Sequence, residues 1–185
     1  IFGLLSFVSY LVEGAVGDWS ALYLFEDKGI VIEEAVMGVM LFNGTMCIGR
    51  LLGNRLGKHL TSKQVVVGGY LLGSIAMGLI VFLPGHASMY TYLLLGISLA
   101  MIVPNLFSAM GEQNVIPMTQ AVATSTMLGY MGILMGPALI GFIAHGTSLT
   151  VAFIVLTTLL VVSAGIGKYA YHLMSKDCGL SEEQI

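Results

Sequence analysis

The stretch SLTVAFIVLTTLLVVSAGIG, residues 148–167, runs for 20 residues without a charged side chain. A helix of about 20 apolar residues crosses the roughly 30 Å hydrocarbon core of a bilayer. Similar runs recur along the 185-residue chain, of which 57% is hydrophobic and 9% charged, whereas a soluble domain carries roughly a quarter charged residues. The sequence therefore predicts an all-α protein that crosses a membrane several times.

Short polar segments divide the chain into six expected membrane spans. They cover residues 1–25, 33–54, 64–83, 88–111, 119–145 and 148–173. The separators have turn or cap chemistry, with Thr147 or Ser148 as an N-cap for the last span. We expect a six-helix transmembrane bundle over 1–173 and a cytoplasmic tail over 174–185. Because the chain opens at Ile1 inside an apolar run, we also expect further sequence upstream.

The basic residues predict the orientation of these spans, because cytoplasmic loops retain lysine and arginine. Of the seven basic residues, only Lys28 falls between the first two spans. The other six lie near the junction of spans two and three or towards the end of the last span. Both termini of this segment are therefore expected on the cytoplasmic side.

Glycine makes up 24 of the 185 residues and recurs at helical intervals in the third and fifth spans. Small residues let helix backbones approach closely in lipid, where no hydrophobic force drives helices together. The pattern predicts a tightly packed bundle.

Several function classes find little support in the sequence. Cys47 and Cys178 form no CxxC spacing, and a net charge of -3 gives no basic surface for nucleic acid. The segment GAVGD is similar to an aspartyl-protease signature, but Ala15 stands where that signature has glycine. Glu13 is the only other acid at depth, and no HExxH or GxSxG motif occurs. We expect no enzyme activity, no catalytic residue, no metal and no cofactor.

Two acids interrupt the apolar segment LVEGAVGDWSALYLF, residues 11–25. An ionised carboxylate at the centre of a membrane helix costs about 2.5–3.5 kcal/mol, so Glu13 and Asp18 are expected to face protein or water. At about 100° per residue they lie roughly 140° apart on an unbroken helix, whereas unwinding at Gly14 and Gly17 would re-aim both. Proton coupling through Glu13 and Asp18 is one interpretation. A packing role for Glu13 and a helix-cap role for Asp18 is the other.

Four further side chains are candidates for a substrate cavity. Trp19 has an aromatic ring that could stack on a substrate, although interfacial aromatics are common at the ends of spans. Asn43 and Asn105 are polar at depth, and Pro104 frees a backbone carbonyl beside Asn105. Hydrogen bonding between helices explains both asparagines equally well. Tyr130 has the same two interpretations.

Three motifs connect the chain with a known family. The segment GRLLGNRLGKHL, residues 49–60, resembles the cytoplasmic loop signature G-x-L-a-D-R-x-G-R-R of the major facilitator superfamily, with asparagine replacing the aspartate. The segment GYMGILMGPALIGFIA, residues 129–144, resembles helix eleven of these transporters. EGAVGDW, residues 13–19, is similar to helix seven of a bacterial inner-membrane branch akin to fucose-permease-like members. The loop-motif residues are Gly49, Arg50, Asn54, Arg55, Gly57 and Lys58; snorkelling to the cytoplasmic interface also explains Arg50.

This resemblance implies that the chain is the C-terminal half of such a transporter. The six helices would form two inverted three-helix repeats in the bacterial inner membrane, facing an N-terminal six-helix half upstream. The implied activity is secondary transport of a sugar or small organic compound by alternating access, coupled to protons. A membrane scaffold or a channel subunit that does not transport by this mechanism is the alternative.

Overall fold

The computed structural model describes residues 1–56, 60–113 and 116–178, and every regular element in these ranges is an α-helix. The elements are α1 (Phe2–Glu26), α2 (Ile32–Leu56), α3 (Ser62–Phe82), α4 (Gly85–Ala100), α5 (Ile102–Glu112), α6 (Met118–Gly146) and α7 (Leu149–Cys178).

Five stretches of the described residues are long and apolar enough to cross a membrane: Ile32–Gly53, Ser62–Phe82, Gly85–Glu112, Met118–Gly146 and Leu149–Lys176. Helix α1 has 25 residues, but Glu13, Asp18 and Glu26 lower its hydropathy. The prediction of an all-helical membrane protein is therefore confirmed in its general form, while the number of six spans stays a prediction.

The expected span 88–111 is divided into two helices in the structure. Helix α4 ends at Ala100 and α5 begins at Ile102. Pro104 has no N–H group to donate to the carbonyl of Ala100 four residues earlier, which explains a break at this position. The backbone N–H of Asn105 resumes the helical pattern by donating to the Met101 carbonyl at 3.2 Å.

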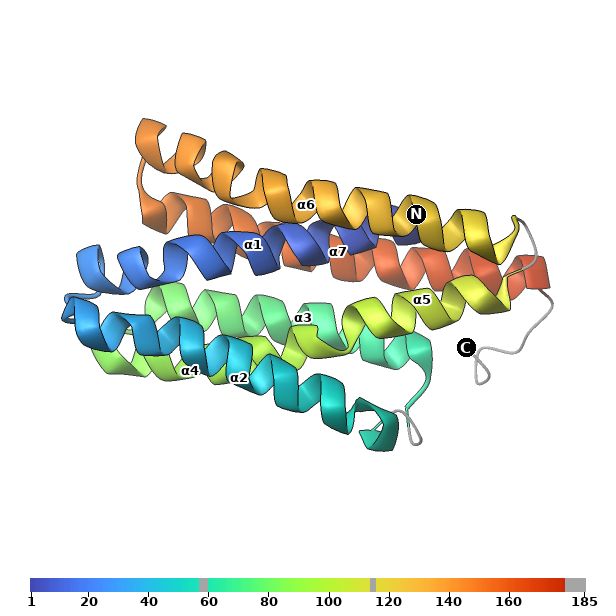
Figure 1. Cartoon of the computed structure of the whole chain (residues 1–185), viewed down its shortest axis with the longest axis horizontal. Coiled ribbons are helices and arrows are strands. Elements are labelled where there is room, and N and C mark those ends of the chain that lie inside the picture. Colours follow the sequence, from blue (N-terminus) through green and yellow to red (C-terminus); the bar gives the residue numbers. More distant parts are fainter. Residues whose placement is uncertain (57–59, 114–115, 179–185) are drawn as a thin grey trace.

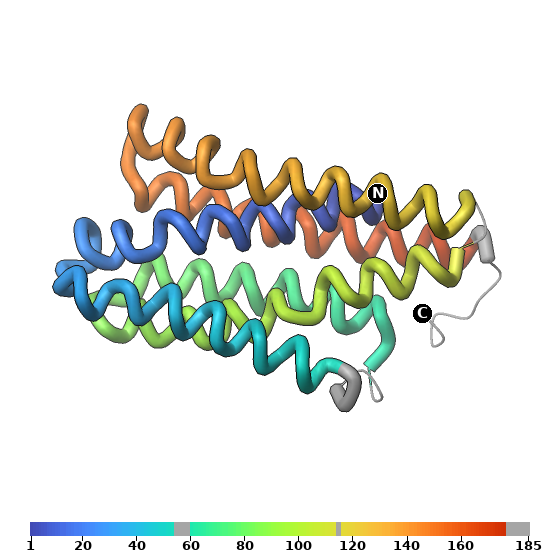
Figure 2. Tube along the Cα trace, viewed as in Figure 1, coloured from blue at the N-terminus to red at the C-terminus, as the bar shows by residue number. Residues whose placement is uncertain are grey.

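The helices run roughly side by side, and the chain reverses at each connection except the one between α4 and α5, which continue in the same direction (Figure 1). Each has one most extensive neighbour: α1 packs on α6, α2 on α4, and α3 on α7. The start of α1 and the late part of α7 lie towards the same end of the bundle (Figure 2), where the rings of Phe2 and Tyr171 meet edge to face at 5.3 Å. The Ser148 N-cap is confirmed, because its Oγ accepts from the Val151 N–H at 3.2 Å.

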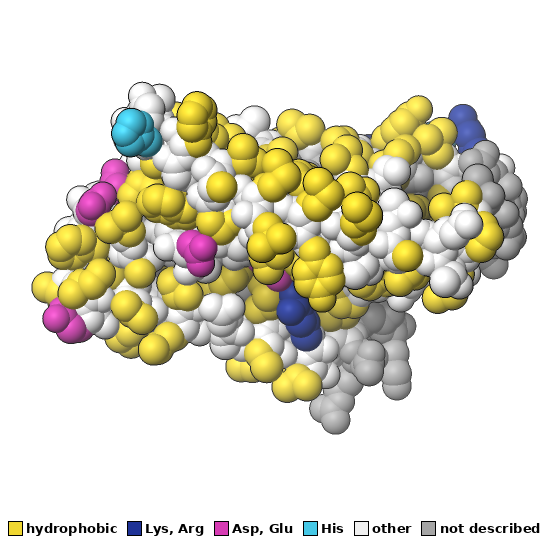
Figure 3. Space-filling model, turned by 45° about the horizontal axis from the view of Figure 1, so that its top comes forward, with side chains coloured by type: hydrophobic (Ala, Val, Ile, Leu, Met, Phe, Trp, Pro, Cys, Tyr) yellow, Lys and Arg dark blue, Asp and Glu magenta, His cyan; other side chains and the backbone are white. Residues whose placement is uncertain are grey.

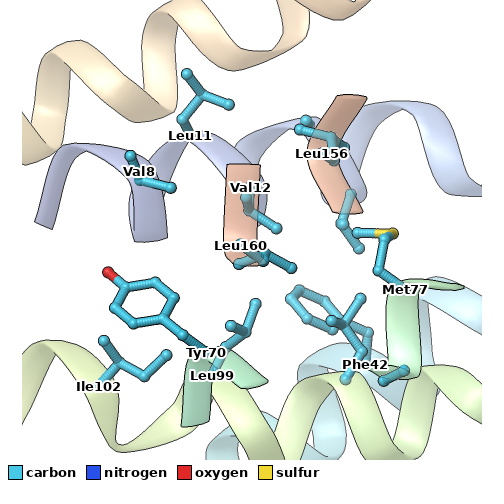
Figure 4. Packing of buried hydrophobic residues seen from close by; sticks show 14 of the residues in the cluster. Val8, Leu11, Val12, Phe42, Tyr70, Met77, Leu99, Ile102, Leu156 and Leu160 are labelled. Carbon is cyan, nitrogen blue, oxygen red and sulfur yellow. The ribbon is translucent and has the colours of Figure 1, made fainter. Parts of the chain in front are cut away.

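The core lies between α1, α3, α7 and the α4–α5 pair. Figure 4 shows Val12 of α1 and Leu160 of α7 above Tyr70 of α3 and Leu99 of α4. All four side chains are fully buried. The Tyr70 hydroxyl is satisfied inside this core, because it bonds the Ser9 hydroxyl at 2.8 Å and donates to the Leu5 carbonyl at 2.7 Å. Helix α1 is thereby held to α3 by polar as well as apolar contacts.

Glycines bring α1 and α6 into backbone contact, as the glycine pattern predicts. The position of a Cβ on Gly132 would overlap the carbonyl oxygen of Phe7, and a Cβ on Gly136 would overlap that of Leu11. A Cβ on Gly14 would lie 2.6 Å from the Ile133 carbonyl oxygen. Only glycine fits at these three positions, and the close contact fixes the position of Glu13 relative to α6.

Candidate functional site

Glu13 and Arg50 form an ion pair between α1 and α2. The Arg50 Nη2 atom donates to Glu13 Oε1 at 2.9 Å. Only 11% of the Glu13 side chain is exposed, compared with 44% of the Arg50 side chain. The acid is therefore covered and the guanidinium reaches the surface of the bundle. On the face in Figure 3, a basic side chain lies over an acidic one near the middle of the molecule.

The antiparallel arrangement of α1 and α2 explains how this pair forms. Counted from the connection between the helices, Glu13 lies 13 residues from Glu26 and Arg50 lies 18 residues from Ile32. At 1.5 Å per residue, their backbones differ in depth by roughly 7.5 Å. Each Cα–Cβ bond tilts towards the N-terminus of its own helix, so the two side chains lean towards each other. The long arginine side chain covers the remaining distance.

Two tyrosines lie beside the ion pair. Tyr10 is one helical turn before Glu13, and its ring packs on Gly129 of α6, where an added Cβ would lie 2.5 Å from the ring. Tyr10 interacts electrostatically with Glu13, Arg50 and Tyr130. Tyr130 is 66% exposed. The candidate site therefore combines one acid, one base and two phenol groups from three helices.

Trp19 connects α1 to α6 two turns further along. Its indole Nε1 donates to the Pro137 carbonyl at 2.9 Å, and its ring lies against Gly141. Pro137 cannot donate to the Ile133 carbonyl, and this carbonyl is the one that packs on Gly14. Trp19 is half-buried, and its polar atom is occupied by a helix-to-helix hydrogen bond.

Asp18 is exposed on the surface of α1. Helix α1 is continuous from Phe2 to Glu26, so the alternative in which the helix unwinds at Gly14 and Gly17 is wrong, and Asp18 caps no second half-helix. The backbone hydrogen bonds of the continuous helix stabilise it by more than the conformational freedom of the two glycines destabilises it. Because the helix is unbroken, the side chains of Asp18 and Glu13 lie on different faces of α1.

The two asparagine candidates bond within their own helices. Asn43 is exposed, and its Nδ2 donates to the Val39 carbonyl at 3.0 Å. Asn105 is half-buried, and its Nδ2 donates to the Met101 carbonyl at 2.8 Å. Neither bond joins two helices.

The loop motif is only partly described. Gly49 packs α2 against α4, where an added Cβ would lie 2.6 Å from the Cβ of Ala100. Asn54 and Arg55 belong to the last turn of α2, but their side chains, and all of Gly57 and Lys58, lie outside the described residues. Arg50 is the motif residue that the structure places in the candidate site.

Two hollows open elsewhere on the bundle. One of about 510 Å³ is lined by residues from the start of α1, the end of α5 and the parts of α6 and α7 beside them. The other, of about 570 Å³, lies near Trp19, Asp27 and His145. Neither includes Glu13 or Arg50. Among the described residues, no group of three or more His, Cys, Asp or Glu side chains could hold a metal ion.

The partnership of Glu13 with Arg50 was missed by sequence reasoning, which treated Arg50 as a loop-motif or snorkelling residue. Counting both residues from the α1–α2 connection and including the tilt of the side chains would have placed them within reach. The signal was present in the spacing, but it requires that α1 and α2 be neighbours.

The fold and the site together define a helical protein with several membrane-length apolar helices and an acid–base pair on one exposed face. Comparison with known proteins is consistent with this class. The chain is 42% identical over 165 residues to an uncharacterised MFS-type transporter of Yersinia pestis, which covers 88% of this chain and 42% of that protein. It is 30% identical over 169 residues to the membrane protein MosC of Rhizobium meliloti, covering 90% of this chain and 42% of MosC.

A third relative is an uncharacterised transporter of Sinorhizobium fredii, 28% identical over 157 residues, covering 83% of this chain and 41% of that protein. No protein-family model matches the chain. The chain spans less than half the length of the curated relatives that it matches.

Proposed function

We propose that this chain supplies the C-terminal half of a secondary active transporter of the major facilitator type, which moves a small solute across the bacterial inner membrane by alternating access. Glu13 is the residue proposed to couple transport to protons. Two of the relatives are named as transporters and come from bacteria, and the chain aligns with about two-fifths of each. An N-terminal half is the proposed partner across the exposed face.

The helix pairing supports two inverted three-helix repeats. In this arrangement α1 corresponds to the α4–α5 pair, α2 to α6, and α3 to α7. Exchanging corresponding helices then turns the α1–α6 pair into the α4–α2 pair. The same exchange leaves the α3–α7 pair unchanged. These are the three most extensive pairings. The proposed arrangement has six spans and both termini of the segment in the cytoplasm.

The observation that carries the proposal is the 2.9 Å ion pair between Glu13 and Arg50 on an exposed face. A charge at mid-membrane costs about 2.5–3.5 kcal/mol on insertion scales, and a scaffold has no need for such a pair. An acid that is covered by a base, but close to the surface of the bundle, is able to exchange a proton when the base moves. Asp18, Trp19, Asn43, Asn105 and Tyr130 are the other proposed contributors.

The test is uptake by the full-length protein in proteoliposomes under an inward proton gradient, with a panel of radiolabelled sugars and small organic anions. Glu13→Gln is expected to abolish accumulation against a gradient and to spare exchange of internal for external solute. Glu33→Gln, at an exposed position at the start of α2, is the matched control. Unchanged pH-driven uptake in Glu13→Gln would contradict proton coupling through this residue. Uptake that never exceeds equilibrium would favour a channel, and the absence of any uptake would favour a scaffold.

A further inference from the structure

We propose that the transported solute is a small organic anion whose carboxylate replaces Glu13 as the partner of Arg50, while Glu13 takes up the coupled proton. This inference rests on the proposed transport function and adds the substrate class to it. It assigns Arg50 a role in binding in addition to its place in the loop motif.

The relative exposure of the two side chains favours an anion over a cation. Arg50 is 44% exposed and Glu13 is 11% exposed, so an approaching solute meets the guanidinium first. A cationic solute would be repelled by Arg50 and would reach the carboxylate only after displacing it. A carboxylate matches the planar fork of an arginine and accepts two parallel hydrogen bonds from it. Among the described residues, the Nη2 atom of Arg50 bonds Glu13, and a guanidinium carries further N–H donors.

Charge neutrality gives the reason for coupling. With Glu13 ionised, the pair has no net charge. An anion that bound to Arg50 without a proton would leave one uncompensated negative charge, and a proton on Glu13 without an anion would leave one uncompensated positive charge. Isolated charges are costly where water is scarce. Only the arrival of both keeps the site neutral, so one proton accompanies each monovalent anion.

Glu13 and Arg50 are the side chains that determine the charge of the site. Among the described residues, Glu13 interacts electrostatically with Arg50 of α2, Tyr10 of α1 and Tyr70 of α3. Tyr130 of α6 interacts with Tyr10. Phenols are neutral at physiological pH, so the charge of the cluster is set by the acid and the arginine. The Tyr70 hydroxyl is already bonded inside the core, whereas the exposed Tyr130 is able to bond a solute.

The experiment uses the full-length protein in proteoliposomes and a radiolabelled library sorted by charge. The library contains neutral sugars and polyols, monocarboxylates such as glucuronate and gluconate, and amines such as glucosamine. We expect pH-driven uptake of monocarboxylates only, unaffected by an imposed membrane potential. Arg50→Gln should reduce this uptake by about tenfold to hundredfold, the loss expected for a hydrogen bond to a charged group. Lys168→Gln, the same charge change at an exposed position of α7, should leave it unchanged.

The variants separate this inference from the proposed function. Glu13→Gln should retain monocarboxylate exchange, because its side chain imitates the protonated acid and leaves Arg50 available. If pH-driven uptake is found for neutral or cationic solutes and survives Arg50→Gln, the anion inference is overturned while proton-coupled transport stands. If no solute of any class is taken up under a proton gradient, the proposed function itself fails, and the inference fails with it.

Discussion

Two faces of the bundle differ in the chemistry of their exposed side chains. One face is formed by α3 from residue 65 and by α7 from 151 to 167. Its exposed positions are aliphatic, aromatic or glycine, with the exception of Thr158. The Thr158 hydroxyl donates to the Ile154 carbonyl of its own helix. Exposed positions on α1, α2 and α6 include Asp18, Asn43, Arg50 and Tyr130. Both faces also carry many exposed apolar side chains.

This difference shows which face suits lipid. Acyl chains offer no hydrogen bonds, so a lipid-facing surface contains side chains without polar atoms or with polar atoms satisfied by their own helix. The α3–α7 face meets this condition. The face formed by α1, α2 and α6 carries the Glu13–Arg50 ion pair, which suits contact with water or with another protein surface. The proposed transport path lies on this second face.

The comparison is tested most strongly by placing an acid at the centre of each face. Ile75 on α3 is 56% exposed and Leu134 on α6 is 76% exposed. Leu134 lies one turn from Tyr130, on the side of the ion pair. Ile75→Asp should cost about 3–4 kcal/mol of insertion free energy, from the difference between isoleucine and aspartate at a membrane centre. Leu134→Asp should cost clearly less, because its side chain reaches water or protein.

The measurement is the amount of folded full-length protein recovered from the membrane fraction, with Ile75→Val and Leu134→Val as controls for the change of side chain. A similar loss for both aspartate variants would show that both positions face lipid, and the distinction between the faces would then be wrong.

A smaller effect is expected inside the bundle, where the α1–α6 seam differs from the α7 surface. A Cβ at Gly132 would overlap the Phe7 carbonyl, whereas Gly165 has nothing within 4 Å. Gly132→Ala should therefore lower the free energy of unfolding by about 2–3 kcal/mol, as overpacking does. Gly165→Ala should raise it by up to about 1 kcal/mol through helix propensity. Thermal unfolding of the purified full-length protein compares the two, and equal midpoints would contradict the close seam.

Much of the fold was predictable because membrane helices have a strong sequence signal. Apolar length predicted the helices to within a few residues, and the cap at Ser148 was visible in the sequence. The break at Met101 was not predicted, although Pro104 was recognised as freeing a carbonyl. A local pattern shows that a proline weakens a helix. Whether the helix ends there depends on how α4 and α5 pack against α2 and α3.

The candidate site was predictable only in part. Glu13 could be selected because an acid at mid-membrane is unusual, whatever surrounds it. The role of Arg50 depends on which helix lies beside α1, and Trp19 bonds a carbonyl 118 residues away in the sequence. Such partners are properties of tertiary packing. The supposed unwinding at Gly14 and Gly17 was wrong for the same reason, since these glycines serve close packing or lie on the surface of an intact helix.

The smallest predicted effect concerns Lys28, which joins the two faces. Lys28 lies in the α1–α2 connection, and its Nζ donates to the carbonyls of Val81 at 2.6 Å and Leu83 at 3.0 Å, at the end of α3. The same atom lies 5.3 Å from the centre of the Tyr23 ring. A cation at the C-terminus of a helix is favourable because of the helix dipole, so this residue ties the polar face to the apolar one.

Burial lowers the pKa of Lys28 below its ordinary value of 10.5, and the nearby Asp27 carboxylate opposes part of this shift. Between the lowered pKa and 10.5, the unfolded chain holds more protons on this residue than the folded chain does. The contribution of Lys28 to the free energy of unfolding should therefore rise with pH through that window and stay constant below it.

Lys28→Met keeps the apolar part of the side chain and removes the titrating group. Thermal unfolding of both proteins between about pH 8 and about pH 11, where an ordinary lysine titrates, should show a stability difference that moves in favour of the wild type as pH increases. A difference that moved the other way would mean that the two α3 carbonyls and the Tyr23 ring stabilise the ammonium form by more than burial destabilises it.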